Sequence, residues 1–366
     1  MKINDFFLGN GCDLNFELIN SLDEIKALKT AEQNPKWHAE GNAYEHTMKC
    51  VEHALMMCKN SLSSLFIKRR LIVAVLLHDI GKPDTTQFIK ENWHSYGHEF
   101  VGEQIARKML WDEKIEERER VCCLIRNHMS VLHAFNTDIS VMLRHMSKFL
   151  PDPFFNWEDE IFVKRCDLLG SIQEDESMYR KDNAKLSSLL WASNYLTKCG
   201  NQQYIHNMLY YEYNNLDKKP TVTFLIGLPG AGKDTYSKSL NGIVLCRDDI
   251  RAELGYCKEG EKYVGSNEEE NNVSKIFHER LIEALKNGHN VVINNINLKK
   301  KYRDEIKTLI LNSGIKVRYN YVYIETMLEN NLKRRPTIGK EIFDRMIRTF
   351  DWPEYKEYDN FQIITN

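Results

Sequence analysis

The sequence has no long apolar segment, no CxxC pair and no large excess of either charge. Its longest purely apolar run, residues 71–77, is too short to cross a bilayer, and no hydrophobic signal core opens the chain. The nine cysteines lack a paired spacing, which indicates reduced thiols. A net charge of −2 excludes coating of long nucleic acid by charge alone, while binding to one end or one phosphate stays open. We expect a cytoplasmic protein with no membrane partner.

The chain is long for a single hydrophobic core. Its 366 residues predict two domains, and 42% hydrophobic with 28% charged residues is typical of a globular protein. A polar connector over residues 214–220 ends in proline and predicts the boundary. We expect an all-α domain over residues 1–215, with its core at about 36–172. An α/β domain with a mostly parallel sheet is expected over residues 216–366.

The clearest motif is the glycine-rich segment GLPGAGK, which follows an apolar stretch and precedes a helical one. Its spacing is the GxxxxGK of a phosphate-binding loop, in which glycines let successive backbone N–H groups curl around phosphate oxygens. A plain glycine turn is the alternative, but the order strand, loop, helix favours the P-loop. Lys233 would reach the β- and γ-phosphates, and either Asp234 or Thr235 would approach Mg²⁺. The nucleotide-binding candidates are Gly227, Gly230, Gly232, Lys233, Asp234 and Thr235.

Two later segments place charged groups near the same expected edge of the sheet. After the second expected strand, Asp248 could accept the proton of an attacking hydroxyl, and Arg251 could hold a phosphate on the acceptor. The alternative is a helix N-cap with a surface arginine. Residues 329–336, ENNLKRRP, could close over a triphosphate or could simply complement the end of a helix.

Together, GLPGAGKDT, RDDIR, NNINL and NNLKRRP resemble the 5′-hydroxyl polynucleotide kinases of the phage RNA-repair type, over about residues 221–350. The resemblance implies that Asp248 is the general base and that Arg251 binds an acceptor 3′-phosphate. It also implies that Arg334 is the lid arginine that stabilises the transferring phosphoryl group. The sequence departs from the family at Asp234, where the loop usually has Ser or Thr, and at Asn295, where the family has an acidic residue.

Histidines and aspartates recur along the expected helices of the first half. Residues 68–80 predict a buried helix that ends in His78 and Asp79, before Gly81 and Pro83. Imidazole and carboxylate groups suit Mn, Fe, Ni, Co, Zn or Mg. A lone His-Asp pair would more often be a satisfied core histidine beside a capping aspartate. This pair is accompanied, in order along the chain, by His46, His98, His128 and Asp167.

That ordered set resembles the HD phosphohydrolase superfamily, closest to the HD domains attached to tRNA nucleotidyltransferases, over about residues 36–172. The resemblance implies that the metal ligands are His46, His78, Asp79 and Asp167. It further implies that His98 and His128 bind a second metal or the scissile phosphate, and that Lys82 stabilises phosphate charge. A divalent ion in such a site lowers the pKa of bound water and neutralises phosphate oxygens.

An HD domain followed by such a kinase is similar to the bacterial HD–polynucleotide kinase family of RNA end-healing enzymes. The resemblance implies phosphorylation of 5′-OH ends of RNA or DNA with ATP or another NTP and Mg²⁺. It also implies removal of a 2′,3′-cyclic phosphate, 2′-phosphate or 3′-phosphate with Mn²⁺, Ni²⁺, Co²⁺ or Zn²⁺, which leaves ends for a nucleic-acid ligase. Two alternatives stay open: an HD nucleotidase fused to a nucleoside or metabolite kinase, and a non-catalytic ATP-gated nucleic-acid-binding or signalling module.

Overall fold

The computed structural model describes residues 1–173, 176–199, 219–257 and 265–366. Its contacts divide the chain into two compact units, Met1–Ile205 and His206–Asn366. The boundary expected between residues 215 and 216 lies outside the described residues and stays a prediction. Within the described part of the chain, no helix combines the length and apolar character needed to cross a membrane.

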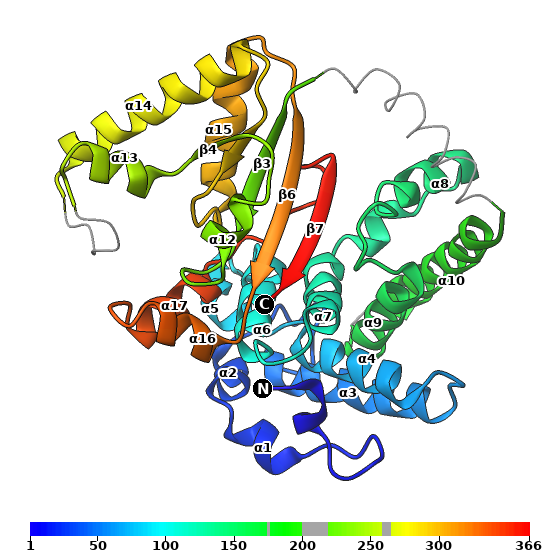
Figure 1. The fold of residues 1–366 in the computed structure, drawn as a ribbon. Coiled ribbons are helices and arrows are strands. Elements are labelled where there is room, and N and C mark those ends of the chain that lie inside the picture. Colours follow the sequence, from blue (N-terminus) through cyan, green and yellow to red (C-terminus); the bar gives the residue numbers. More distant parts are fainter. Residues whose placement is uncertain (174–175, 200–218, 258–264) are drawn as a thin grey trace. The chain divides into compact units, whose positions relative to one another are not determined.

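The first unit is helical, as the sequence predicts (Figure 1). Its helices are α1 (Phe16–Ser21), α2 (Asp23–Ala27), α3 (Ala43–Lys59), α4 (Leu65–Leu77), α5 (Lys82–Thr85), α6 (His98–Met109), α7 (Ile115–Asn127), α8 (Ile139–Ser147), α9 (Trp157–Gly170) and α10 (Glu176–Cys199). Short 3-10 turns η1 (Ile3–Phe6), η2 (Leu28–Thr30) and η3 (Val131–Ala134) join them, and β1 (Gln87–Ile89) pairs with β2 (Asn92–His94) in an antiparallel hairpin. The sequence analysis missed this hairpin, whose strands are too short to show an alternating pattern.

Helix α4 is the centre of the first unit. Ser64 caps its start by accepting a hydrogen bond from the Ile67 N–H at 3.4 Å, and every residue from Arg69 to Leu77 is buried. Because α3, α7 and α9 all pack against it, the part of the helix from Leu71 to Leu77 is apolar on every side instead of along one stripe. It ends at Leu77, so the next two residues, His78 and Asp79, emerge where the surrounding helices meet.

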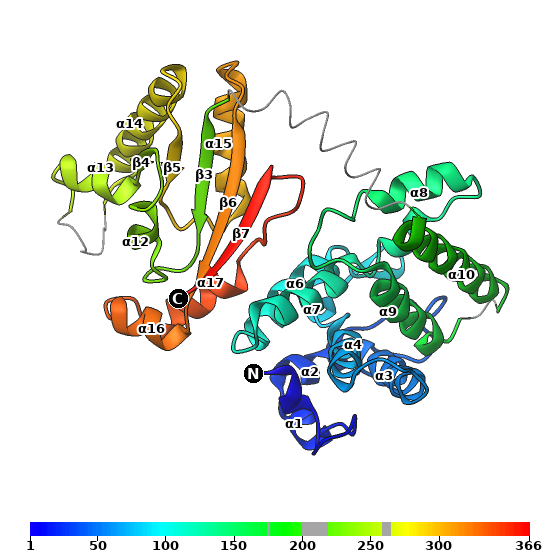
Figure 2. The ribbon, with the colours of Figure 1, turned by 45° about the vertical axis from the view of Figure 1, so that its right-hand side comes forward.

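The second unit contains a five-stranded sheet in the order β4-β5-β3-β6-β7 (Figure 2). The strands are β3 (Thr221–Ile226), β4 (Ile243–Leu245), β5 (Val291–Ile293), β6 (Arg318–Glu325) and β7 (Asn360–Thr365), and every pair is parallel. The helices are α12 (Lys233–Ser237), α13 (Arg247–Glu253), α14 (Asn267–Lys286), α15 (Lys300–Asn312), α16 (Leu328–Arg334) and α17 (Lys340–Arg348). The mostly parallel sheet that the sequence predicts is therefore present.

Strand β3 lies in the middle of this sheet. Its residues from Val222 to Ile226 are buried, since strands flank it on both sides and helices cover the sheet. For this reason the sequence of a central parallel strand is usually an almost continuous apolar run. In a sheet of this type ligands bind beyond the carboxyl ends of the strands, and the chain leaves β3 there through Gly227.

Candidate phosphate and metal sites

The loop after β3 needs glycine for steric reasons. A Cβ atom added at Gly227 would lie 2.3 Å from the carbonyl oxygen of Ile324 on β6. Gly230 and Gly232 have φ angles of +77° and +104°, a region that other residues rarely adopt. The loop can therefore curl close to the sheet and turn its backbone N–H groups inward, as a phosphate-binding loop requires.

Lys233 lies inside this loop. Its Nζ donates hydrogen bonds to the carbonyl oxygens of Gly227 at 2.9 Å and Leu228 at 3.0 Å. Burial of the ammonium lowers the pKa of Lys233 to about 8, although the neighbouring charge of Asp234 raises it in part. The lysine thus occupies the place where phosphate charge would be neutralised.

The end of α16 packs on the loop. Asn331 Nδ2 donates to the Pro229 carbonyl oxygen at 2.8 Å, and Arg334 Nη1 donates to the Gly230 carbonyl oxygen at 3.0 Å. Arg335 Nη2 lies 3.4 Å from Asp234 Oδ2. The structure therefore brings Arg334 to the phosphate loop, and it adds Arg335, which the sequence analysis had not singled out.

Asp234 and Thr235 are the two oxygen donors expected near Mg²⁺. Asp234 Oδ1 accepts a hydrogen bond from Asn294 Nδ2 at 2.8 Å, which joins the loop to the end of β5. Thr235 is exposed, and its hydroxyl has no hydrogen-bond partner among the described residues. A carboxylate and a hydroxyl are both hard oxygen ligands of the kind that Mg²⁺ prefers, so this donor set fits the ion.

Asp248 and Arg251 form an ion pair on α13, a short helix that the sequence analysis expected only under its N-cap alternative. Asp248 lies in the first turn with 81% of its side chain exposed, and its negative charge is among those that raise the pKa of Lys233. Arg251 also donates to both carboxylate oxygens of Glu270 on α14, at 2.7 and 3.0 Å. The sequence analysis missed Glu270, because its role depends on the packing of α14 against α13.

Four of the residues predicted to bind metal converge in the first unit. His46 Nε2 lies 3.1 Å from Asp167 Oδ1 and 3.6 Å from Asp79 Oδ2. His78 Nε2 lies 3.4 Å from the same Asp79 oxygen and 3.9 Å from Asp167 Oδ1. These groups come from α3, the end of α4 and the last part of α9, and all four residues are buried.

The other two predicted histidines adjoin the opposite oxygen of Asp79. His98 Nε2 lies 3.3 Å from Asp79 Oδ1 and 3.2 Å from His128 Nε2. Lys82 Nζ lies 2.7 Å from Asp79 Oδ2 and donates to Gln33 Oε1 at 2.5 Å. Asp79 therefore lies between two groups of candidate ligands. Burial alone would raise the pKa of its carboxyl group, but nearby cationic groups outweigh burial and hold the pKa well below the usual range.

Three of the imidazoles are oriented in the same way. The Nδ1–H of His78 donates to the Val75 carbonyl oxygen at 2.7 Å. His98 and His128 donate in the same manner to the carbonyl oxygens three residues before them, at 2.6 Å each. Because a carbonyl oxygen can only accept, these bonds fix the proton on Nδ1 and leave Nε2 facing the cluster.

The cluster fits a divalent cation. The Nε2 of His78 is fully buried and, among the described residues, has no hydrogen-bond partner. A buried polar atom without a partner costs free energy that coordination would recover. Three groups of residues each place their donor atoms within 4.8 Å of one another: His46, Cys50, His78 and Asp167; Asp79, His98 and His128; and His38, Glu40 and His46. The sequence analysis missed Cys50, whose thiol lies 3.4 Å from His46 Nε2.

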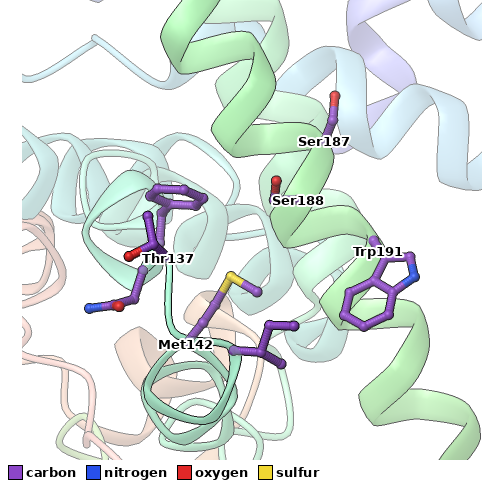
Figure 3. Close-up of a pocket in the computed structure, with 8 residues that line it drawn as sticks. Thr137, Met142, Ser187, Ser188 and Trp191 are labelled. Atoms are coloured by element: carbon purple, nitrogen blue, oxygen red, sulfur yellow. The ribbon is translucent and has the colours of Figure 1, made fainter.

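A shallow pocket of about 590 Å³ lies elsewhere in the first unit. It is lined by Phe135, Asn136, Thr137, Ile139, Met142, Ser187, Ser188 and Trp191, and Figure 3 shows Met142 on α8 facing the α10 residues Ser188 and Trp191. None of these residues belongs to the histidine and aspartate cluster, so the pocket is not part of that centre.

Both halves of the chain match known domain families. Residues 43–144 match an HD domain model and residues 222–353 match an AAA domain model. The first match includes five of the six clustered residues and ends before Asp167. The second includes the glycine-rich loop, the Asp248–Arg251 pair and Arg334.

Curated relatives match over short stretches. A protein of Autographa californica nuclear polyhedrosis virus, named as a bifunctional polynucleotide kinase/RNA ligase, is 36% identical over 121 residues, which are 30% of this chain and 17% of the relative. A CC-adding tRNA nucleotidyltransferase of Thermus thermophilus is 33% identical over 114 residues, 30% of this chain and 25% of the relative. The chain thus spans 17% to 25% of the length of these relatives.

Among solved structures, one chain of a Pnkp1/Rnl/Hen1 complex aligns with 33% of this chain and 40% of its own length, at 23% identity and a TM-score of 0.29. The two domain matches and the two sites agree in position along the sequence. The chain therefore contains a segment that matches an HD domain, followed by a segment that matches an AAA domain, in the order that its motifs predict.

Proposed function

We propose that this chain is a bifunctional enzyme that heals broken nucleic-acid ends. Its P-loop domain would phosphorylate a 5′-OH end with ATP or another NTP, and its HD domain would remove a 2′,3′-cyclic phosphate, 2′-phosphate or 3′-phosphate. The observation that carries the proposal is that one chain holds two groups of side chains whose chemistry suits reactions at phosphorus. One is a lysine-bearing phosphate loop beside an Asp–Arg pair, and the other is a buried cluster of four histidines and two aspartates.

In the kinase reaction the 5′-oxygen would bond to the γ-phosphorus as the bond to the β,γ-bridging oxygen breaks, and a nucleoside diphosphate would leave. The hydroxyl proton would pass to the carboxylate of Asp248. Lys233 and Arg334 would stabilise the charge that spreads over the phosphoryl oxygens, and both already contact the loop backbone. Asp234 or Thr235 would hold Mg²⁺, and Arg251 would bind a 3′-phosphate on the acceptor.

In each hydrolytic step a water oxygen would bond to phosphorus as an ester oxygen leaves, and the proton lost by the water would end on the leaving oxygen. A monoester would need one such step, and a 2′,3′-cyclic phosphate would need two. His46, His78, Asp79 and Asp167 would hold a first divalent ion, such as Mn²⁺, Ni²⁺, Co²⁺ or Zn²⁺. His98 and His128 would bind a second ion or the phosphate itself. Such ions supply Lewis-acid stabilisation of phosphate oxygens and a more acidic water. Lys82, buried against Asp79, would balance phosphate charge.

One substrate tests both reactions. An RNA oligonucleotide with a 5′-OH and a 2′,3′-cyclic phosphate is incubated with ATP and each divalent ion in turn, and the ends are identified by mass. We expect Asp248→Asn to stop only the 5′ reaction and Asp79→Asn to stop only the 3′ reaction. If either variant keeps both reactions or loses both reactions, the assignment is contradicted.

The same assay with free nucleosides and nucleotides tests the alternative function, an HD nucleotidase fused to a small-molecule kinase. Preference for those over oligonucleotide ends would favour it. A DNA oligonucleotide of the same sequence tests the choice of nucleic acid, and addition of a nucleic-acid ligase tests whether the healed ends can be joined.

A further inference from the structure

His46 differs from the other histidines of the cluster in the group that holds its Nδ1. His78, His98 and His128 donate to backbone carbonyl oxygens, whereas His46 donates to the carboxylate oxygen Oε1 of Glu40 at 2.7 Å. A carboxylate in this position fixes the tautomer and ring orientation of a metal-binding histidine and makes it a more basic ligand. No motif in the sequence indicates this partner.

Glu40 also joins the two helices that carry His46 and Asp167. Its side chain is fully buried, and its second oxygen, Oε2, accepts a hydrogen bond from the Ile172 N–H at 2.8 Å. The neighbouring Ala39 N–H donates to the Ile172 carbonyl oxygen at 2.9 Å. Because Ile172 lies two residues after the end of α9 and Glu40 lies three residues before the start of α3, these bonds tie the segment that enters α3 to the segment that leaves α9.

In each of its hydrogen bonds to described residues, the Glu40 carboxylate is the acceptor. Oε1 accepts from His46 and also from His38 Nδ1 at 2.9 Å, and Oε2 accepts from a backbone N–H. A glutamine has the same shape but offers one oxygen and one NH₂ group. Its NH₂ group would therefore face either the N–H groups of the two histidines or the N–H of Ile172, and two donors cannot form a hydrogen bond. For this reason the site favours a carboxylate over an uncharged side chain of the same size.

We propose that Glu40 is a positioning residue of the metal centre, which holds His46 with its Nε2 toward the ion and fixes the distance between α3 and α9. The inference rests on the divalent-metal centre of the proposed function. It adds to that centre an outer carboxylate, shared between the ligand His46 and the partly exposed His38.

Metal affinity measures this role without any assay of activity. Co²⁺ is titrated into the metal-free full-length protein and bound ion is measured by equilibrium dialysis and by visible absorption. We expect Glu40→Gln to weaken Co²⁺ binding by about 10- to 100-fold and to alter the absorption spectrum. His38→Gln keeps the bond between Glu40 and His46, so its affinity should stay close to that of the wild type.

A double-mutant cycle with His46→Ala separates a role through His46 from a general loss of structure. If Glu40 acts through His46, Glu40→Gln should weaken binding little further once His46 is gone. Should Glu40→Gln fail to fold, as judged by circular dichroism, Glu40→Asp keeps the charge but draws it away from His46, and the same weakening is expected.

Wild-type affinity in a folded Glu40 variant, or effects that add fully in the cycle, would overturn the role of Glu40 alone. A wild-type protein that binds no Co²⁺ would instead remove the metal centre of the proposed function, and this inference with it. The two failures are therefore distinguishable.

Discussion

Asp248 and Arg251 are paired with each other one turn apart on α13, so the expected base and the expected acceptor-binding arginine neutralise one another. Glu270 adds a second carboxylate to the same guanidinium. An arriving acceptor phosphate would compete for Arg251 and release the Asp248 carboxylate for the hydroxyl proton. Binding of the acceptor and activation of the base would then be coupled.

Asp248→Asn should lower the turnover of 5′-phosphorylation by about 10²- to 10⁴-fold, the usual contribution of a general base. Nucleotide affinity should change far less, because the Asp248 carboxylate is bonded to Arg251, whereas Lys233 is held by the carbonyl oxygens of the loop. Transfer of labelled phosphate from ATP to a 5′-OH oligonucleotide measures the effect. Glu253→Gln removes another carboxylate of α13, one that pairs with Arg280 on the surface, and should retain activity. Full turnover in Asp248→Asn would exclude this residue as the base.

Arg251→Leu should remove discrimination between acceptors with and without a 3′-phosphate. A charged hydrogen-bonded pair contributes about 1.5–3 kcal/mol, so the KM for a nucleoside 3′-phosphate should rise by about 10- to 100-fold. The KM for an acceptor that lacks this phosphate should change far less. Arg280→Leu on neighbouring α14 serves as the matched control. An equal rise in KM for both acceptors would mean that Arg251 holds α13 and α14 together through Glu270 and does not bind the 3′-phosphate of the acceptor.

Lys233 should take up a proton when nucleotide binds above pH 8. Burial lowers its pKa to about 8, so at pH 8.5 most of the free protein carries a neutral amine. Phosphate oxygens favour the ammonium form and raise the pKa, so binding draws in a proton; at pH 7 the lysine is already charged and uptake vanishes.

Calorimetric titration with a non-hydrolysable ATP analogue, in buffers of different ionisation enthalpy, measures this uptake. Lys233→Arg keeps a group that stays protonated at both pH values and should abolish the dependence on buffer. Identical heats in all buffers at pH 8.5 for the wild type would contradict the lowered pKa.

Glu160 on α9 should destabilise the first unit near neutral pH. It is fully buried, and neither carboxylate oxygen has a hydrogen-bond partner among the described residues. Burial raises the pKa of this carboxyl well above the usual value, although the charge of Arg126 opposes the shift. The folded state therefore holds a proton that the unfolded state releases above its own pKa of about 4.5, and stability falls as pH rises from there.

Glu160→Leu should accordingly raise the free energy of unfolding at pH 7 by on the order of 1–3 kcal/mol. It should also flatten the decline of stability above pH 5. Urea unfolding at pH 5 and pH 7, followed by circular dichroism, checks both effects. Lower stability of the variant at pH 7 would show that the carboxylate has a favourable role.

Local motifs and ordered residue types could be read from the sequence, whereas contacts between distant segments could not. The loop from Gly227 to Lys233 is contiguous, so its spacing alone predicts its shape. The cluster around His78 and Asp79 followed from the order of its members along the chain. Glu40 and Glu270 were missed because an acidic residue acquires such a role only when another helix brings a histidine or an arginine to it. The α13 helix was expected only under the N-cap alternative, because its seven residues are too few to show a helical period.

His78→Ala should abolish the stabilisation of the first unit by divalent ions. Among the described residues its buried Nε2 has no hydrogen-bond partner, and the cluster forms only when the chain folds, so an ion held there binds the folded state in preference to the unfolded one. At a hundred times the dissociation constant such binding adds about 2.7 kcal/mol, which raises the melting temperature by several degrees. Thermal melts of the full chain with Co²⁺, Ni²⁺, Mn²⁺ or Zn²⁺, before and after chelation, measure the shift. His94→Ala removes a histidine that stacks on Tyr96 outside the cluster and should keep the full shift. Retention of the shift in His78→Ala, or its absence in the wild type with all four ions, would contradict a metal centre at this position.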